Sequence, residues 1–456
     1  MMDLNQLYTT RRTGKNSTNH DIRTEYQRDF DRLIFSSPFR RLQNKTQVFP
    51  LPGSTLVHNR LTHSLEVASV GRSLGKVVGG MILKERKELL TDEAREFYNY
   101  HLSEVIAAGC LAHDIGNPAF GHSGEKAISH YFLSGAIDKN LFNEAEWEDI
   151  THFEGNANAL RILTNQFNGR LPGGYRLTLT TLATILKYPC ESIGIEKSKK
   201  HLKKYGFFQT ERAVFDAIVN EFGLIKEKES PLQYCRHPFV YLLEAADDIS
   251  YRIIDFEDAA RLGIITRELM IESIIGMISE IGRDVDDLNE INEVVNAIFD
   301  ENEKLSYLRS RAINTLIMKA AEVYLLHLDE MLAGKYNNTL IDEIQGNCEA
   351  LKKIEKISLE KIYNHPTVIE IELAGFNVMS ELLSTWVPAV VKNKKNRSAP
   401  EAKVMQLIPD QYGPFKEEDS AYSKVIKVLD VVSGMTDLYA TELYRKIKGI
   451  DIGKHK

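Results

Sequence analysis

Cysteine is scarce in this 456-residue chain, and its four residues are scattered without a CxxC or comparable spacing: Cys110, Cys190, Cys235 and Cys348. A disulfide framework or a cysteine zinc ribbon is therefore not expected, and buried free thiols are the default. No apolar run is long enough to cross a bilayer, and the first residues lack the charged-then-apolar pattern of a secretory signal. We therefore expect a cytoplasmic protein that makes no membrane contact.

A basic excess is also missing, since 57 Lys and Arg stand against 64 Asp and Glu, for a formal net charge of −7. This balance argues against a protein that coats nucleic acid, although it leaves room for a local basic pocket. Basic residues cluster in two runs, at 197–204 and 392–397. Each run is either a solvated surface or a binding site for polyphosphate, an effector nucleotide or a nucleic-acid single strand.

Strand patterns are few, and helical periodicity dominates the chain. Apolar residues recur at helical spacing over 61–86, 103–114, 123–135, 153–168, 177–188, 208–222, 238–260, 268–282, 287–327, 338–355, 366–385 and 419–447. The best strand candidate is a short hairpin that pairs Thr46–Phe49 with Ser54–Val57. The sequence thus predicts an all-α fold, a helical bundle with at most a small β-hairpin near the N-terminus.

The most informative segment is 112–122, in which His113 and Asp114 are adjacent. A helix of small apolar residues leads to this pair, and Gly116 and Pro118 end it. Adjacent helical residues point about 100° apart, so they can converge on one ion only if the helix ends there. A divalent cation would compensate a buried imidazole beside a buried carboxylate. The alternative is a His–Asp hydrogen bond that caps the helix end.

Two further segments can complete a metal site. His63 lies in the first turn of the helix expected over 61–86, where a ligand can face a site beyond the helix end; taken alone, it would be a surface histidine. Asp247, Tyr251 and Asp255 follow one another at i, i+4 and i+8, on one stripe of a helix with apolar neighbours. Burying such carboxylates without a cation or hydrogen-bond donors is costly, which makes a solvated acidic face the weaker alternative.

A third segment supplies a His–carboxylate pair. The i, i+3 spacing of His122 and Glu125 places both side chains on one face of a new helical turn. A carboxylate beside an imidazole orients the ring and favours its protonated form, which suits a proton donor.

Together these segments provide two histidines and two aspartates as metal ligands: His63, His113, Asp114 and Asp247. This nitrogen and oxygen set suits manganese, magnesium or iron and leaves positions open for water. Zinc or nickel are further candidates, and the lack of cysteine ligands counts against zinc. A divalent ion of this kind polarises phosphoryl oxygens and lowers the pKa of water.

The ordered set His63, His113-Asp114 and Asp247 resembles the HD superfamily of metal-dependent phosphohydrolases. Longer blocks narrow the resemblance to bacterial deoxyguanosinetriphosphate triphosphohydrolases and their dNTPase-like relatives; these blocks are 39–49, 59–64, 113–118 and 244–251. The resemblance is strong over residues 20–265 and thin beyond. It implies metal-dependent hydrolysis of dGTP or several dNTPs at the α-phosphorus, which yields the deoxynucleoside and inorganic triphosphate.

The resemblance also implies roles for individual residues. The metal ligands are His63, His113, Asp114 and Asp247, and the catalytic pair is His122 with its partner Glu125. Phosphate contacts come from Arg60 and Lys187. The sugar is bordered by Tyr251, its 3′-hydroxyl is held by Gln47 and Asp255, and Tyr363 and His365 resemble a base- and sugar-side segment of vertebrate relatives. Some relatives have a second active-site histidine before the glutamate of the block that follows His122. Here His152 lies one position away from that place, so it receives no catalytic role.

We expect an irregular segment at 1–20, a phosphohydrolase core at 21–265 and a helical region at 266–456. The last region would pack on the core, complete the nucleotide pocket and form an oligomer interface, since hexamers or tetramers are usual in the family that the chain resembles. A second dNTP or single-stranded DNA could act as an allosteric activator. Two alternatives stay open: an HD phosphohydrolase for nucleoside monophosphates, cyclic nucleotides or alarmones, and a non-catalytic nucleotide or single-strand sensor.

Overall fold

The computed structural model describes residues 1–14, 22–49, 57–282 and 285–451. The helices of its first part are α1 (Glu25–Ile34), α2 (Ser37–Arg41), α3 (Arg60–Glu85), α4 (Asp92–Glu96), α5 (Leu102–Ala112), α6 (Gly121–Leu133), α7 (Glu144–Thr151), α8 (Gly155–Thr164), α9 (Leu179–Ile185), α10 (Arg212–Phe222) and α11 (Phe239–Arg261). Those of its second part are α12 (Arg267–Ile281), α13 (Val285–Ala297), α14 (Glu301–Leu326), α15 (Leu328–Leu332), α16 (Leu340–Gly346), α17 (Glu349–Ile357), α18 (Pro366–Val391), α19 (Ala399–Val404), α20 (Ala421–Ser433) and α21 (Asp437–Ile447).

The all-α prediction is confirmed, and strands are confined to one small sheet within the described part of the chain. Strand β1 (Lys226–Lys228) pairs antiparallel with β2 (Gln233–Tyr234). This sheet is not the hairpin predicted from the sequence, most of whose turn and second strand (50–56) lie outside the described residues; Thr46 forms a single antiparallel bridge with Asn59. Among the described helices, none pairs bilayer-spanning length with enough apolar character to cross a membrane.

Helix caps divide two segments that periodicity alone predicts as single helices. The segment 287–327 contains α13 and α14, because the Asp300 side chain accepts hydrogen bonds from two backbone N–H groups and starts a new helix. The segment 419–447 contains α20 and α21, because Thr436 caps a second helix after a break at Gly434. Apolar spacing continues across both breaks, so periodicity does not detect them.

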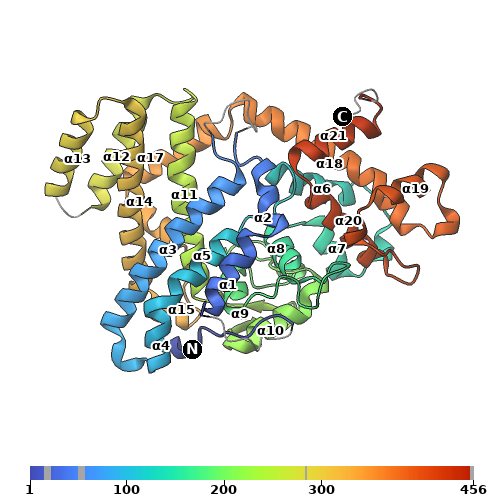
Figure 1. Cartoon of the computed structure of the whole chain (residues 1–456), viewed down its shortest axis with the longest axis horizontal. Coiled ribbons are helices and arrows are strands. Elements are labelled where there is room, and N and C mark those ends of the chain that lie inside the picture. Colours follow the sequence, from blue (N-terminus) through green and yellow to red (C-terminus); the bar gives the residue numbers. More distant parts are fainter. Residues whose placement is uncertain (15–21, 50–56, 283–284, 452–456) are drawn as a thin grey trace.

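The buried apolar residues form two clusters that meet at residues 115–119, just after the His113-Asp114 pair. The first cluster surrounds α3, α5, α11 and α14, and the second lies between α6, α18 and α20, around the fully buried Trp386. In Figure 1 the helices of the first group lie towards the left and the centre, and those of the second lie to the right. Ile115 belongs to the first cluster and Ala119 to the second. The residues that follow His113 therefore cross from one cluster to the other.

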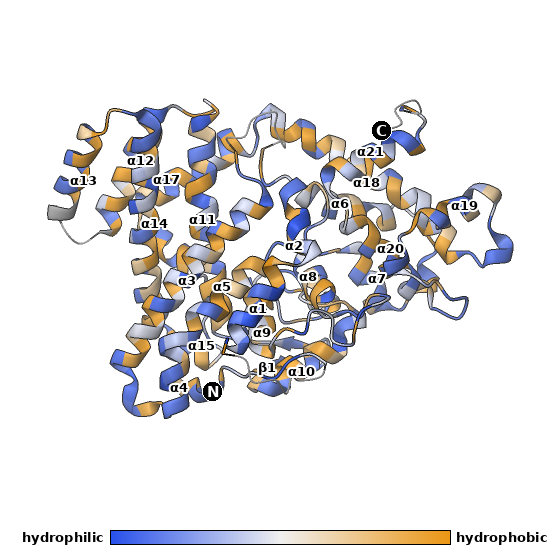
Figure 2. Cartoon of the chain, viewed as in Figure 1, coloured by the Kyte–Doolittle hydropathy of each residue, from blue (hydrophilic) through white to orange (hydrophobic). Residues whose placement is uncertain are grey.

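Helix α5 is the most apolar element near the site, and Figure 2 shows its hydrophobic colour at the centre of the molecule. It packs closely on α3 because Gly71, Gly75 and Gly79 repeat every four residues along the facing side of α3. A Cβ atom at Gly79 would lie 2.1 Å from the backbone oxygen of Tyr98, which no side chain can tolerate. Gly80, one residue further, faces open space.

The two glycines provide a matched test of this packing. We expect Gly79→Ala to destabilise the protein by about 1–3 kcal/mol, the usual cost of forcing an extra carbon into a close contact. Gly80→Ala should instead leave the free energy of unfolding unchanged or raise it by up to about 1 kcal/mol, because alanine favours the helix. Denaturant unfolding of both variants measures the difference. Equal stability of the two variants would contradict a close contact between Gly79 of α3 and Tyr98, in the turn just before α5.

Candidate active site

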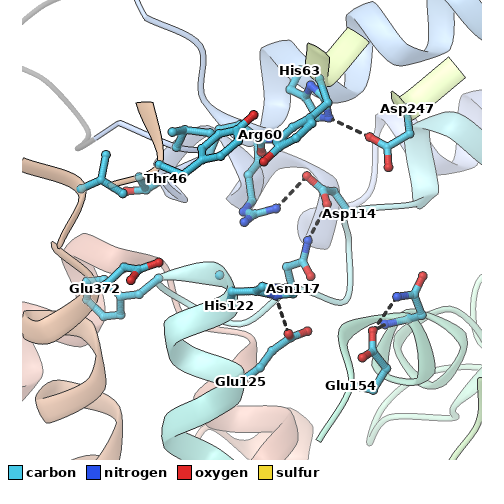
Figure 3. A pocket seen from close by; sticks show the side chains of 18 of the residues that line it. Thr46, Arg60, His63, Asp114, Asn117, His122, Glu125, Glu154, Asp247 and Glu372 are labelled. Atoms are coloured by element: carbon cyan, nitrogen blue, oxygen red, sulfur yellow. Dashed lines mark hydrogen bonds and ion pairs between the residues drawn. The ribbon is translucent and has the colours of Figure 1, made fainter. Parts of the chain in front are cut away.

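The four predicted metal ligands lie near one another where three helices meet, and Figure 3 shows three of them, His63, Asp114 and Asp247. His63 comes from the first turn of α3, His113 and Asp114 follow α5, and Asp247 lies on α11. Ligand atoms of His63, His113 and Asp114 all lie within 4.8 Å of one another. Asp247 Oδ1 lies 3.2 Å from His63 Nε2 and 3.5 Å from His113 Nε2. Asp247 therefore lies beside both histidines of this group.

Local structure explains why adjacent residues can share this site. Helix α5 ends at Ala112, and the turn that follows presents His113 and Asp114 in the same direction. Gly116 lets this turn pack against α8, because a Cβ atom there would lie 1.9 Å from the backbone oxygen of Gly155. The start of α3 is held by a capping box at Asn59, which orients the first turn with His63.

The donor set fits a divalent cation. His113 Nδ1 lies 2.6 Å from the carbonyl oxygen of Cys110, so Nδ1 donates and Nε2 carries a lone pair. That Nε2 atom is buried and has no hydrogen-bond partner among the described residues. Burial alone would raise the pKa of Asp247, but His113 and His63 outweigh it and hold the pKa well below its ordinary value. An ionised carboxylate and an unpartnered imidazole nitrogen are the groups that a cation would satisfy.

Asp114 is held by two further side chains. Arg60 Nη1 donates to its Oδ2 at 2.9 Å, and Asn117 donates to its Oδ1. Burial raises the pKa of Asp114, but Arg60 and the two histidines more than offset this and lower it. Gly121 has a φ of 55°, and a Cβ atom there would lie 2.4 Å from Arg60 Nη2. Asn117 was not among the sequence-predicted site residues, although it belongs to the same segment.

His122 and Glu125 form the predicted pair on the first turns of α6. His122 Nδ1 lies 2.8 Å from Glu125 Oε2, and the Gly155 N–H donates to Glu125 Oε1 at 2.8 Å. Burial would raise the pKa of Glu125, but the hydrogen bond with His122 outweighs it and lowers it. The His122 side chain is 69% exposed, so its ring has access to the cavity.

A second buried carboxylate lies beside this pair and was missed by sequence reasoning. Glu154 Oε2 forms an ion pair with Lys204 Nζ at 2.7 Å. Burial, reinforced by the nearby Glu125 carboxylate, raises the pKa of Glu154. The only signal for this group in the sequence is the basic run 197–204, which contains Lys203 and Lys204.

These groups line one cavity of about 590 Å³, a volume within the range of small-molecule sites. The predicted residues in its wall are Gln47, Arg60, His63, Asp114, His122, Glu125, Asp247, Tyr251 and Tyr363. Additional polar residues in the wall are Thr46, Asn117, Glu154, Asn156, Tyr188, Lys203, Lys204, Asp248 and Glu372. The C-terminal region contributes Tyr363, Val368, Ile371 and Glu372.

One end of the cavity is aromatic. The rings of Tyr251 and Tyr363 stack with centroids 5.4 Å apart and an interplanar angle of 12°. The Tyr363 hydroxyl donates to Asp255 Oδ2 at 3.2 Å. Gln47 lies in the same wall, and its buried Oε1 has no hydrogen-bond partner among the described residues. Asp255 itself does not line the cavity and reaches it through Tyr363.

Three other predicted residues do not line the cavity: His113, Lys187 and His365. Lys187 Nζ lies 3.3 Å from Glu244 Oε1, so the lysine is paired with this buried carboxylate. The next residue, Tyr188, lines the wall instead. His365 is the residue before α18, and its Nδ1 lies 2.8 Å from the Thr367 hydroxyl. The substrate contacts expected for Lys187 and His365 stay predictions.

The two basic runs have different surroundings. In the run 197–204, Lys199 pairs with Glu227 and Lys200 with Asp342, whereas Lys203 and Lys204 line the cavity. In the run 392–397, Lys392 pairs with Glu401, and Arg397 donates to a backbone carbonyl. Only the first run contributes to the site.

Comparisons with known proteins extend over the whole chain. The HD domain family matches residues 60–169. A deoxyguanosinetriphosphate triphosphohydrolase-like protein from Synechocystis sp. is 39% identical over 463 residues, which cover 99% of this chain and 100% of that protein. A protein of the same description from Pseudomonas aeruginosa is 35% identical over 98% of this chain and 99% of its own length. The deoxyguanosinetriphosphate triphosphohydrolase of Yersinia pestis is 28% identical over 94% of each chain.

The proximity of these ligands predicts a specific loss of metal. We expect Asp247→Asn to weaken binding of manganese or magnesium by at least about tenfold, a loss already seen when only an outer-shell partner of a ligand is removed. Metal content after dialysis, measured by mass spectrometry, checks this without any assay of activity. Asp248→Asn is the matched control, because that carboxylate is directed to Arg252 and should leave metal content unchanged. Undiminished metal in Asp247→Asn would remove this residue from the ligand set.

Proposed function

The chain belongs to the deoxyguanosinetriphosphate triphosphohydrolase family, and we propose that it hydrolyses deoxynucleoside triphosphates to the deoxynucleoside and inorganic triphosphate. The observation that carries the proposal is a metal-type ligand set at one cavity, with His63, Asp114 and Asp247 in the wall, together with a separate His–Glu pair in the same wall. A binding protein has no need of the second feature. dGTP alone or several dNTPs are the proposed substrates.

In this proposal the residues of the cavity wall bind and neutralise the triphosphate. Arg60 presents a planar guanidinium fork for phosphate oxygens, and Lys203 and Lys204 add point charges from the opposite wall. A divalent ion held by His63, His113, Asp114 and Asp247 would polarise a phosphoryl oxygen and lower the pKa of water. Arg60 therefore has two partners, the ligand Asp114 and the substrate.

Proton transfer is assigned to His122. Its Nδ1–H donates to Glu125, which leaves Nε2 free to face the substrate. Water attacks the α-phosphorus, the bond from phosphorus to the 5′-oxygen breaks, and protonated His122 donates its Nε2 proton to the departing oxygen. Glu125 is fixed by the Gly155 N–H, so the ring direction is set before substrate binds.

The aromatic end of the cavity is assigned to the sugar. Tyr251 and Tyr363 present stacked rings that would crowd a 2′-hydroxyl, and the unpartnered Gln47 Oε1 offers an acceptor for the 3′-hydroxyl. Asp255 supports this wall through the Tyr363 hydroxyl. A sugar whose hydroxyl leaves a buried polar partner unpaired, or lacks room, is rejected.

The proposal also assigns parts to the chain. Residues 21–265 form the phosphohydrolase core, since they carry the four metal-type ligands and the His–Glu pair. The region 266–456 completes the nucleotide cavity through the start of α18 and the residue Tyr363 before it.

Product analysis tests the function directly. We expect the protein, supplied with manganese or magnesium and each dNTP singly and mixed, to release triphosphate and deoxynucleoside, with GTP a poorer substrate than dGTP. Phosphorus NMR identifies the released phosphate. Release of orthophosphate or pyrophosphate would instead favour another HD phosphohydrolase, and metal-dependent binding without turnover would favour a sensor.

The His–Glu pair predicts a separate kinetic effect. We expect His122→Ala to lower turnover by about two to four orders of magnitude, the span usual for acid–base residues, with metal content and dNTP binding largely retained. His152→Ala is the matched control, because His152 forms a similar helical pair with Glu148 at 2.9 Å but does not line the cavity. The control should keep nearly normal turnover. Full activity of His122→Ala would exclude His122 as the proton donor.

A further inference from the structure

We propose that the first turn of α21 holds the loop that carries His122 in its active position, with Asp437 as the positioning residue. This inference rests on the proposed function for its kinetic consequence, but its structural basis is independent of that function. Residues 117–122, which we call the catalytic loop, contact α18 and α21 directly and are linked to α20 through Lys45. These contacts place the proton donor under the control of elements far from it in sequence.

Asp437 connects two walls of the cavity. Its side chain is buried, Oδ1 accepts the Phe120 N–H at 2.8 Å, and Oδ2 accepts the Thr46 N–H at 2.8 Å. Phe120 precedes His122 by two residues, and Thr46 precedes Gln47. One carboxylate therefore fixes the backbone on both the proton-donor side and the sugar side of the cavity.

The backbone at Phe120 needs such support. Phe120 has a φ of 60°, in the left-handed region that side chains other than glycine rarely adopt, and Gly121 follows with a φ of 55°. No side chain caps the first turn of α6 at Phe120. A strained conformation of this kind persists only where surrounding contacts over-determine it. The Asp437 hydrogen bond is one such contact.

Helix α18 provides a second. Gly375 leaves room for the Phe120 ring, because a Cβ atom there would lie 2.4 Å from Phe120 Cγ. Any larger residue at this position would displace the ring and, with it, the strained backbone that leads into α6.

Helix α20 provides a third. Buried Lys45 donates to the backbone oxygen of Asn117 at 2.5 Å and to that of Ser433 at 2.9 Å. The beginning of the catalytic loop is thereby tied to the end of α20. Asp437 and Gly375 thus contact these six residues directly, and Ser433 is linked to them through Lys45.

The two hydrogen bonds that Asp437 accepts come from Phe120 and Thr46, and neither involves a metal-type ligand. Asn117, the loop residue that holds the ligand Asp114, is tied by Lys45 and not by Asp437. Releasing Asp437 should therefore misplace His122 without disturbing the metal site. The expected signature is a fall in kcat per folded molecule with metal content retained, and a rise in KM because Asp437 also holds Thr46 beside Gln47 in the cavity wall. Loss of folded protein alone would lower apparent kcat and bound metal together and would leave KM and kcat per folded molecule unchanged.

Asp437→Asn tests this, because the amide has nearly the same shape but turns one acceptor into a donor that faces a backbone N–H. We expect kcat per folded molecule to fall about 10- to 100-fold, as for a reacting group displaced by about 1 Å. Hydrogen exchange of the Phe120 amide, followed by mass spectrometry, should accelerate about tenfold or more, since its acceptor is weakened. The matched control is Thr436→Ala, which removes the cap of the same helix without touching the catalytic loop.

The outcomes separate this inference from the proposed function. If wild-type protein releases no triphosphate, the proposed function fails, yet the exchange measurement still decides the role of Asp437. Unchanged Phe120 exchange, or a kcat equal to that of Thr436→Ala, overturns the inference. If Asp437→Asn does not fold, Gly375→Ala replaces it: accelerated Phe120 exchange with retained metal supports positioning by the C-terminal region, and wild-type exchange refutes it.

Discussion

Two carboxylates and two imidazoles, drawn together in a largely buried place, set the central constraint of this molecule. Each ionised carboxylate there must be balanced, because removing a charge from water without a partner is costly. Arg60 and Asn117 balance Asp114 from one side, while the lone pair of His113 Nε2 stays unpartnered. A divalent cation would complete that balance. The packing of α3, α5 and α11 brings these side chains into the geometry that this site requires.

Because the site lies between two hydrophobic clusters, its metal-type ligands and its His–Glu pair are held by different clusters. The metal-type ligands belong to helices of the first cluster, and His122 and Glu125 belong to α6 of the second. Ile115 and Ala119 show where the chain passes between them. Substrate bound in the cavity would contact both, so its binding and the transfer of a proton depend on how the clusters are held together. Asp437 lies at that junction.

Two His–Glu pairs in this chain show that the local geometry of such a pair does not define its role. His122–Glu125 and His152–Glu148 have nearly equal separations, 2.8 and 2.9 Å, and both lie on helices. A second cavity of about 780 Å³ is lined by both pairs, but only His122 and Glu125 also line the cavity with the metal-type ligands. The two pairs thus differ in whether they face the metal-type ligands, and not in their own geometry.

The sequence by itself determined the helical class, because apolar periodicity is a local property, and it indicated His63, His113, Asp114 and Asp247 as candidate ligands and His122–Glu125 as a candidate pair. It did not reveal the breaks before α14 and α21, whose caps interrupt apolar spacing that continues across them. Only tertiary structure decided that Lys187 pairs with Glu244 and that Lys203 and Lys204 line the cavity. The same holds for Asp437, which accepts the Phe120 N–H across more than 300 residues. Contacts between distant residues depend on how buried surfaces pack together, and no local pattern records that packing.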